Sequence, residues 1–154
     1  MKKLPPIQKI LEAYTAIVDN HVHLTAEQAE VTSSNKAKNY TVSWDNDIYR
    51  SNDNATYWQG YAGYPVIAVL MLQGKLPYDQ RLAENFKAVD WNKINTKYKR
   101  NYGEATTEVI KEKGLKENEV MTELEKVYTD LKELPIIIKR GSLRPPKAKK
   151  AAEI

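Results

Sequence analysis

The sequence carries a cluster of basic side chains near its C-terminal end, the group best suited to binding a charged partner. Residues 135–154 hold one acid, Glu153, and six basic side chains: Lys139, Arg140, Arg144, Lys147, Lys149 and Lys150. The formal net charge of the chain is +4, so the other 134 residues, with 18 basic and 19 acidic side chains, are slightly acidic. A basic segment displaces counterions from a phosphate backbone. We therefore expect it to bind DNA or RNA.

The expected mode of binding follows from what this segment contains and lacks. Gly141, Pro145 and Pro146 keep the chain extended, so that it can follow a groove or a row of phosphates. Residues 135–154 contain no aromatic side chain and no rigid element for reading base edges, which predicts binding without sequence preference. An acidic protein surface and an anionic membrane are the alternative partners. A solubilising terminus without a ligand is the structural alternative.

Two further groups of side chains could contribute to such binding. A second basic cluster lies beside Tyr98 and Tyr102 in the sequence and consists of Lys93, Lys97, Lys99 and Arg100. These side chains form either a helix face that contacts phosphates or a solvated helix face without a ligand. The aromatic side chains of residues 57–61 could stack on unpaired bases, at about 1–3 kcal/mol for each base, or pack beneath a loop: Tyr57, Trp58 and Tyr61.

The remaining polar clusters favour structural roles. Asp45, Asp47 and Asp53 are close in the sequence, and paired carboxylates can act as acid and base or hold magnesium. Aspartates in turns more often serve backbone geometry, so a magnesium-dependent hydrolase is the least favoured function. His21 and His23 would share one face of a strand, but two imidazoles without a third ligand make a poor metal site.

Other classes of chemistry have no signal in the chain. It contains no cysteine, which excludes disulfides, thiolate metal sites and cysteine nucleophiles. No phosphate-binding loop, dinucleotide fingerprint or nucleophile elbow is present. We therefore expect a non-enzymatic protein that uses neither a cofactor nor a metal.

Three segments follow one another within residues 40–76: the strand YTVSW, the stretch SNDN and the apolar segment GYPVIAVLMLQGKL. In this order they resemble the SWIM zinc-finger family. In that family a C-x-C motif on a strand and a C-x-H motif at the start of a helix bind zinc, and a variable loop lies between the two motifs. The ligand positions here are Tyr49 and Ser51, then Gly63 and Pro65, which cannot bind a structural zinc ion. The resemblance implies a degenerate, metal-free domain that binds DNA, RNA or protein without catalysis.

Hydrophobic periodicity predicts the elements that position these residues. Apolar positions at helical spacing predict an amphipathic helix over residues 5–19. Alternating apolar and polar side chains predict a small antiparallel sheet, with strands at residues 21–24, 29–32, 40–44 and 48–51. An almost continuous apolar run predicts a buried central helix over residues 64–73, ended by Gly74. Residues 52–63 are expected to form a loop.

The chain after this helix is expected to be helical. A short helix covers residues 79–88. Asp90 caps a longer helix that Gly103 interrupts and Gly114 ends. Residues 136–138 can add a strand to a sheet edge.

The last predicted helix carries a regular apolar stripe. Asn118 is its expected cap and Pro135 its stop. The stripe has the spacing of a coiled-coil seam and is expected to pack against the preceding helix or to contact a second subunit: Val120, Leu124, Val127, Leu131 and Leu134.

Together these patterns predict an α+β fold: a small antiparallel sheet with a buried central helix, a helical C-terminal part and a basic extended tail. The expected parts are residues 1–88, 89–134 and 135–154. No apolar run approaches the roughly 18 residues of a membrane span, and no signal peptide is recognisable, so we expect a cytoplasmic, nucleoid or virion location. The expected function is to coat or package DNA or RNA through self-association. A protein-interaction or ribosome-associated module anchored by the tail is the alternative.

Overall fold

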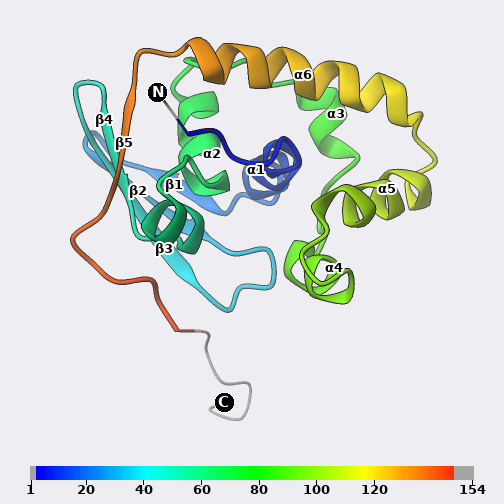
Figure 1. Ribbon diagram of the computed structural model, residues 1–154, viewed down its shortest axis with the longest axis horizontal. Helices are drawn as coiled ribbons and strands as arrows, with labels where there is room; N and C mark the ends of the chain where they lie inside the picture. The colour runs from blue at the N-terminus through cyan, green and yellow to red at the C-terminus, as the bar shows by residue number, and fades with distance from the viewer. Residues whose placement is uncertain (1–2, 148–154) are drawn as a thin grey trace.

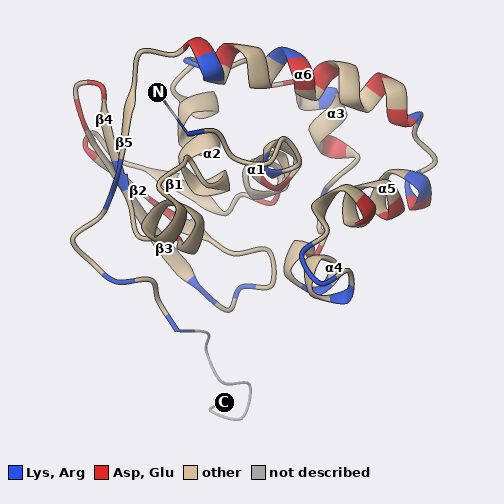
Figure 2. Cartoon of the chain, in the orientation of Figure 1, with Lys and Arg blue, Asp and Glu red and all other residues tan. Residues whose placement is uncertain are grey.

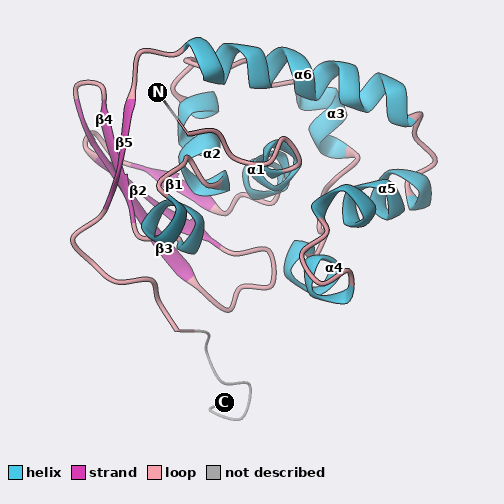
Figure 3. Cartoon of the chain, in the orientation of Figure 1, coloured by secondary structure: helices cyan, strands magenta, loops and turns pink. Residues whose placement is uncertain are grey.

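The fold is α+β, as the sequence predicted, and the computed structural model describes residues 3–147 of it (Figure 1). Helices cover one face of a five-stranded sheet (Figure 3). The expected binding residues Lys149 and Lys150 lie outside the described residues. None of the helices in the described part of the chain combines the length and the apolar character that a membrane span requires.

The sheet is built from four antiparallel strands and one parallel edge strand. Its order is β1-β2-β3-β4-β5, and β5 pairs in parallel with β4. Side chains alternate between faces along a strand, so every second residue of β2 and β3 is buried. The strand bounds match the predicted ones closely: β1 Val22–Leu24, β2 Gln28–Thr32, β3 Asn39–Asp45, β4 Ile48–Ser51 and β5 Ile137–Arg140.

The central helix α2 (Tyr64–Leu72) packs between the sheet and the first helix, α1 (Lys9–Val18). Its residues from Pro65 to Met71 are all buried, because the sheet covers one side and α1 another. This explains why its sequence is apolar all round and not amphipathic. The turn at Gly74 has φ +76°, a conformation that glycine adopts without a steric penalty. The prediction of a buried central helix ended by Gly74 is therefore confirmed.

The expected long helix after Asp90 is two helices, α4 (Trp91–Lys97) and α5 (Tyr102–Glu112). Asp90 does cap α4, since its carboxylate accepts a hydrogen bond from the Lys93 amide. The break falls before Gly103, at residues 98–101, and Asn101 caps α5. Gly103 therefore lies inside α5, and the prediction that it interrupts the helix is wrong. The short helix α3 (Gln80–Glu84) precedes this pair.

The last helix, α6 (Glu117–Glu133), begins before Asn118, so Asn118 is not its cap. Four of its five stripe residues are almost fully buried in the common core: Val120, Leu124, Val127 and Leu131. α6 packs on α1 and α5. This burial favours packing against the chain's own helices and corrects the expectation of a subunit contact for these four residues, whereas Leu134 is only partly buried. One hydrophobic core joins the sheet, α1, α2 and α6.

The basic segment begins inside the sheet. Lys139 and Arg140 belong to β5, where they pair with Arg50 and Ser51 of β4. The chain leaves the sheet at Gly141, bends at Ser142 and Leu143 and continues without helix or strand to Lys147 (Figure 1). A part of the expected tail is therefore held in a fixed direction by backbone pairing.

Candidate functional site

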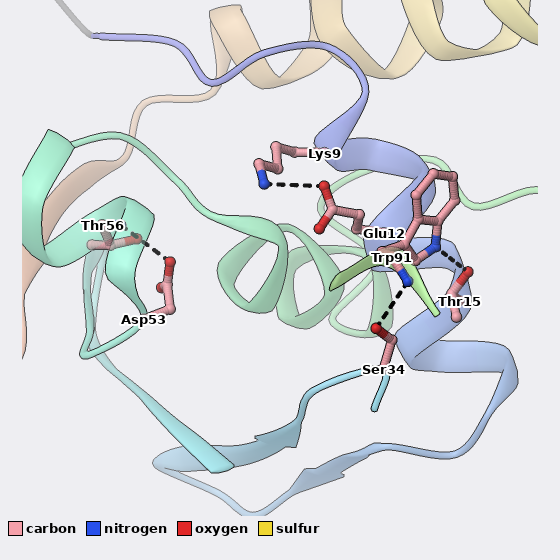
Figure 4. A network of polar contacts seen from close by, with 7 residues as sticks. All are labelled: Lys9, Glu12, Thr15, Ser34, Asp53, Thr56 and Trp91. Carbon is pink, nitrogen blue, oxygen red and sulfur yellow. Dashed lines mark hydrogen bonds and ion pairs between the residues drawn. The ribbon is translucent and has the colours of Figure 1, made fainter. Parts of the chain in front are cut away.

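A pocket of about 400 Å³ lies where several segments of the chain meet. These are α1, the β2–β3 turn, the start of β3, the single π-helical turn η1 (Ala55–Gln59), the start of α2, α4 and the start of α5. The lining is polar and aromatic (Figure 4 shows part of it). Residues 52–63 were expected to form a loop, and η1 gives that segment a defined shape at the rim of the pocket.

A buried ion pair lies in the wall that α1 contributes. The Lys9 Nζ is 3.0 Å from Glu12 Oε2, and both side chains are only about one-tenth exposed. The Lys9 ammonium also lies 4.2 Å from the centre of the Tyr102 ring, a cation–π contact. Burial alone would lower the pKa of Lys9, but Glu12 and Tyr102 outweigh it and raise that pKa above its usual value. Lys9 is therefore charged at neutral pH.

Asp53 is buried at the start of η1 and holds this turn together. Its carboxylate accepts a hydrogen bond from the Ser51 hydroxyl. It also accepts one from the Thr56 amide at 3.1 Å (Figure 4). Burial raises the pKa of Asp53, although these hydrogen bonds act in the opposite direction. A Cβ atom on Gly63 would lie 2.0 Å from Asp53 Oδ2. Only glycine at position 63 leaves room for the carboxylate.

Two tyrosines form a second wall of the pocket. The rings of Tyr40 and Tyr64 meet edge to face with centroids 6.3 Å apart. Burial and the neighbouring Asp53 raise the pKa of Tyr40 to about 12. Burial and Tyr40 raise the pKa of Tyr64 well above its usual value. Both phenols are therefore neutral hydrogen-bonding groups at physiological pH.

Trp91 joins α4 to the rest of the pocket. Its indole Nε1 donates a hydrogen bond to Thr15 Oγ1 at 2.8 Å, and its amide donates to Ser34 Oγ at 3.1 Å (Figure 4). The Thr15 hydroxyl in turn donates to the Phe86 carbonyl at 2.7 Å. These bonds connect α4 with α1 and the β2–β3 turn, so three walls of the pocket are joined by hydrogen bonds of buried and half-buried side chains.

Arg100 lines the pocket from the strained connection between α4 and α5. Lys99 and Arg100 have φ values of 53° and 68°, and left-handed conformations at non-glycine residues cost free energy. The Arg100 amide donates to the Asn95 carbonyl at 2.8 Å, which holds this connection against α4. Arg100 belongs to the pocket lining, and its neighbour Lys99, which has the same left-handed conformation, does not.

The C-terminal segment passes beside η1. The Arg140 guanidinium lies 4.5 Å from the centre of the Tyr57 ring, and Tyr57 meets Trp58 edge to face with centroids 4.7 Å apart. Trp58 is 64% exposed and also lines the pocket. The Asn52 side-chain amide donates to the Arg144 carbonyl at 3.3 Å. The structure thus brings the expected aromatic and C-terminal basic groups together, beside the pocket.

The second basic cluster is divided by the structure. Lys97 forms an ion pair with Glu108 at 2.7 Å, and of its four members only Arg100 lines the pocket: Lys93, Lys97 and Lys99 do not. Figure 2 shows basic stretches on the β2–β3 turn, on the connection after α4 and along the C-terminal segment.

The three aspartates of the hydrolase alternative are not brought together. Asp45 and Asp47 lie at the β3–β4 hairpin, whereas Asp53 follows the opposite end of β4. Strand β4 advances by about 3.3 Å for each residue, so it separates the two groups. Within residues 3–147, no three His, Asp or Glu side chains are grouped as metal ligands, and His21 and His23 have no third partner of this kind.

Comparison with known proteins places the chain in a family. The family described as "Uncharacterised conserved protein UCP014422" matches residues 2–137. The chain belongs to this family. The span that matches UCP014422 contains all the residues that line the pocket, and it ends before Arg140. No curated protein and no solved structure matches the chain. The resemblance to SWIM domains remains a prediction.

Sequence reasoning missed most of the residues that line the pocket. Lys9 and Glu12 fall within the amphipathic helix predicted over residues 5–19, and neither they nor Tyr40, Trp91 and Asn95 received a functional role. Lys9 and Glu12 are spaced at i and i+3, which allows them to pair on a helix. This spacing does not reveal that other elements cover both side chains. Lining residues come from positions 9 to 102, and no local pattern joins positions so far apart.

Proposed function

We propose that this protein binds single-stranded DNA or RNA, without sequence selectivity, along the surface formed by η1 and residues 140–147. The observation that carries the proposal is the position of Arg140 against Tyr57, beside the exposed Trp58. Proteins that bind single strands combine a basic track for the backbone with aromatic rings on which bases stack. Both parts lie side by side here.

The exposure of Trp58 favours a single strand over a duplex. An indole that is 64% exposed has a free face for stacking, and the bases of a duplex are already stacked on one another. Arg144 and Lys147 extend the basic track beyond Arg140. Phosphate contacts of this kind give affinity and register but no sequence reading, which supports binding without selectivity.

The proposal concerns binding by one copy of the chain. Coating of nucleic acid would require contacts between copies, and the apolar stripe of α6 that was expected to provide them is buried in the chain's own core. Binding through η1 and the basic segment requires no second copy. A protein-interaction module anchored by the same segment is the outcome that would replace this proposal if the nucleic-acid experiment fails.

The test is fluorescence anisotropy with labelled single-stranded DNA and RNA of mixed sequence across a salt series. The double variant Arg140→Gln/Arg144→Gln should lower the affinity and reduce the slope of log K against log salt by about 1.4, at about 0.7 for each lost phosphate contact. The matched control Lys113→Gln/Lys132→Gln removes the same charge from the C-terminal ends of α5 and α6 and should change neither quantity.

The aromatic contribution has its own readout. Trp58→Ala should weaken binding by about 1–3 kcal/mol, the value of one base stack, while the salt slope stays unchanged because no charge is removed. The proposal fails if the wild-type protein does not bind single strands at low salt. It also fails if the control pair weakens binding as much as the Arg140/Arg144 pair.

A further inference from the structure

The walls of the pocket resemble the surroundings of a bound nucleobase. Its aromatic walls are formed by Tyr40, Tyr61, Tyr64, Trp91 and Tyr102, and five side-chain amides line it as well: Asn35, Asn54, Gln59, Asn92 and Asn95. A base is recognised through its flat face by aromatic rings and along its edges by groups that donate and accept hydrogen bonds. Each amide offers both a donor and an acceptor.

The charges around the pocket favour an anion. Lys38 and Arg100 line it, while the negative charge of Glu12 is matched by Lys9 at 3.0 Å. Burial raises the pKa of Asp53, so burial disfavours its charged form. The unmatched charge at the pocket is therefore positive. A guanidinium such as that of Arg100 binds two phosphate oxygens at once.

We infer that this pocket binds one nucleotide unit, with the base between the aromatic walls and the phosphate at Arg100 and Lys38. A volume of about 400 Å³ lies within the usual range of small-ligand pockets, about 300–1,000 Å³. The unit is either a free nucleoside monophosphate or one unstacked nucleotide of a bound strand. Binding of a nucleotide within a strand rests on the proposed function, whereas binding of a free nucleoside monophosphate does not.

Trp58 connects the pocket with the surface proposed for the strand. It lines the pocket and also contacts Tyr57. The Arg140 guanidinium in turn packs over the Tyr57 ring. A strand that follows the basic segment would therefore pass the mouth of the pocket. One of its bases can leave the stack and enter, as bases do in proteins that read single-stranded nucleic acid.

Binding of a free nucleoside monophosphate is tested by isothermal titration calorimetry with AMP and UMP. Adenosine, ribose 5-phosphate and inorganic phosphate are the comparison ligands. Each monophosphate should bind at least tenfold more tightly than any of these fragments, because base and phosphate are held by different walls. Equal affinity for AMP and inorganic phosphate would identify a general anion site and would overturn the inference.

Variants separate the base from the phosphate. Arg100→Gln should weaken AMP binding about tenfold and leave adenosine binding unchanged. Its control is Lys99→Gln, the neighbouring residue with the same backbone conformation, which does not line the pocket and should have no effect. Asn95→Ala should weaken AMP and adenosine equally. Because Asn95 is buried, the exposed Asn92→Ala serves as a second variant if the first does not fold.

Binding of one nucleotide within a single-stranded nucleic acid is tested with two oligonucleotides. One is fully abasic, and the other is abasic except for a single central base. The single base should raise the affinity, and Arg100→Gln should remove the gain. If strands bind but the base adds nothing and AMP does not bind, the inference fails while the proposed function stands. If AMP binds and strands do not, the pocket inference stands and the proposed function fails.

Discussion

The Lys9 ammonium and the Glu12 carboxylate form an ion pair of 3.0 Å one turn apart on α1, with both side chains about one-tenth exposed. Burying two charges is costly, and their mutual attraction compensates only while both are present. The pair faces the pocket and lies beside the Tyr102 ring. It therefore fixes the electrostatic balance of the pocket as well as the packing of α1.

Removal of one partner of this pair should destabilise the protein strongly. Glu12→Gln leaves the Lys9 charge buried without its counterion and should lower the free energy of unfolding by about 3 kcal/mol. Glu123→Gln is the matched control, because it breaks a pair with Lys126 at the same i,i+3 spacing whose side chains are more exposed, 66% for Lys126 and 27% for Glu123, and it should cost less than about 1 kcal/mol. Urea denaturation of both variants measures the difference. Similar losses would show that the Lys9–Glu12 pair is not buried in solution.

The carboxyl of Asp53 should make stability depend on pH in an unusual direction. Burial raises its folded-state pKa above the ordinary 3.8. A group with a raised pKa contributes stability that is fully present below pH 3.8 and is lost as pH rises through the folded value. Asp53→Asn stays neutral, so its stability relative to the wild type should increase as pH rises from 4 to 8.

Urea unfolding of the wild type and of Asp53→Asn at several pH values tests this prediction. The difference between the two proteins isolates Asp53 from the other acids. A difference that stays constant with pH, or that favours the wild type at high pH, would show that the Ser51 and Thr56 hydrogen bonds hold the pKa of Asp53 down.

Gly63 should be intolerant of the smallest side chain. Its φ of −75° suits any residue, so the restriction comes from space alone: an added Cβ would lie 2.0 Å from Asp53 Oδ2. Gly63→Ala should lower the free energy of unfolding by about 1–3 kcal/mol, the usual cost of overpacking. Gly103→Ala meets no atom closer than 3.6 Å and lies in α5, where alanine should stabilise by about 0.5–1 kcal/mol. Thermal denaturation should therefore shift the two melting temperatures in opposite directions.

The strained connection before α5 should show a trade-off between stability and binding. Lys99→Gly and Arg100→Gly each relieve a left-handed conformation and should raise the free energy of unfolding by about 0.5–1 kcal/mol. Arg100→Gly should also lose the phosphate-dependent part of AMP binding, whereas Lys99→Gly should keep it. Denaturation and calorimetry on the same samples test both effects. Loss of AMP binding in both variants would assign the effect to backbone rigidity and not to the guanidinium.

Local patterns in the sequence predicted most of the elements correctly. Gly74 ends α2 and Pro135 follows the end of α6 because each changes the backbone at its own position. Asp90 caps α4 through an amide three residues away. The sheet strands follow from side-chain alternation, which is a property of each strand by itself. Where two local signals competed, as at Gly103 and Asn101, the capping side chain and not the glycine set the boundary.

The sequence by itself determined the α+β class, the succession of helices and strands and the basic C-terminal segment, since these depend on neighbouring residues. Only the tertiary structure decided what surrounds each side chain. It buried Lys9, Glu12 and Asp53 at one pocket, turned the α6 stripe into the chain's own core and placed Arg140 on Tyr57 through the pairing of β5 with β4. The physical reason is that burial and electrostatic environment arise from contacts between distant segments.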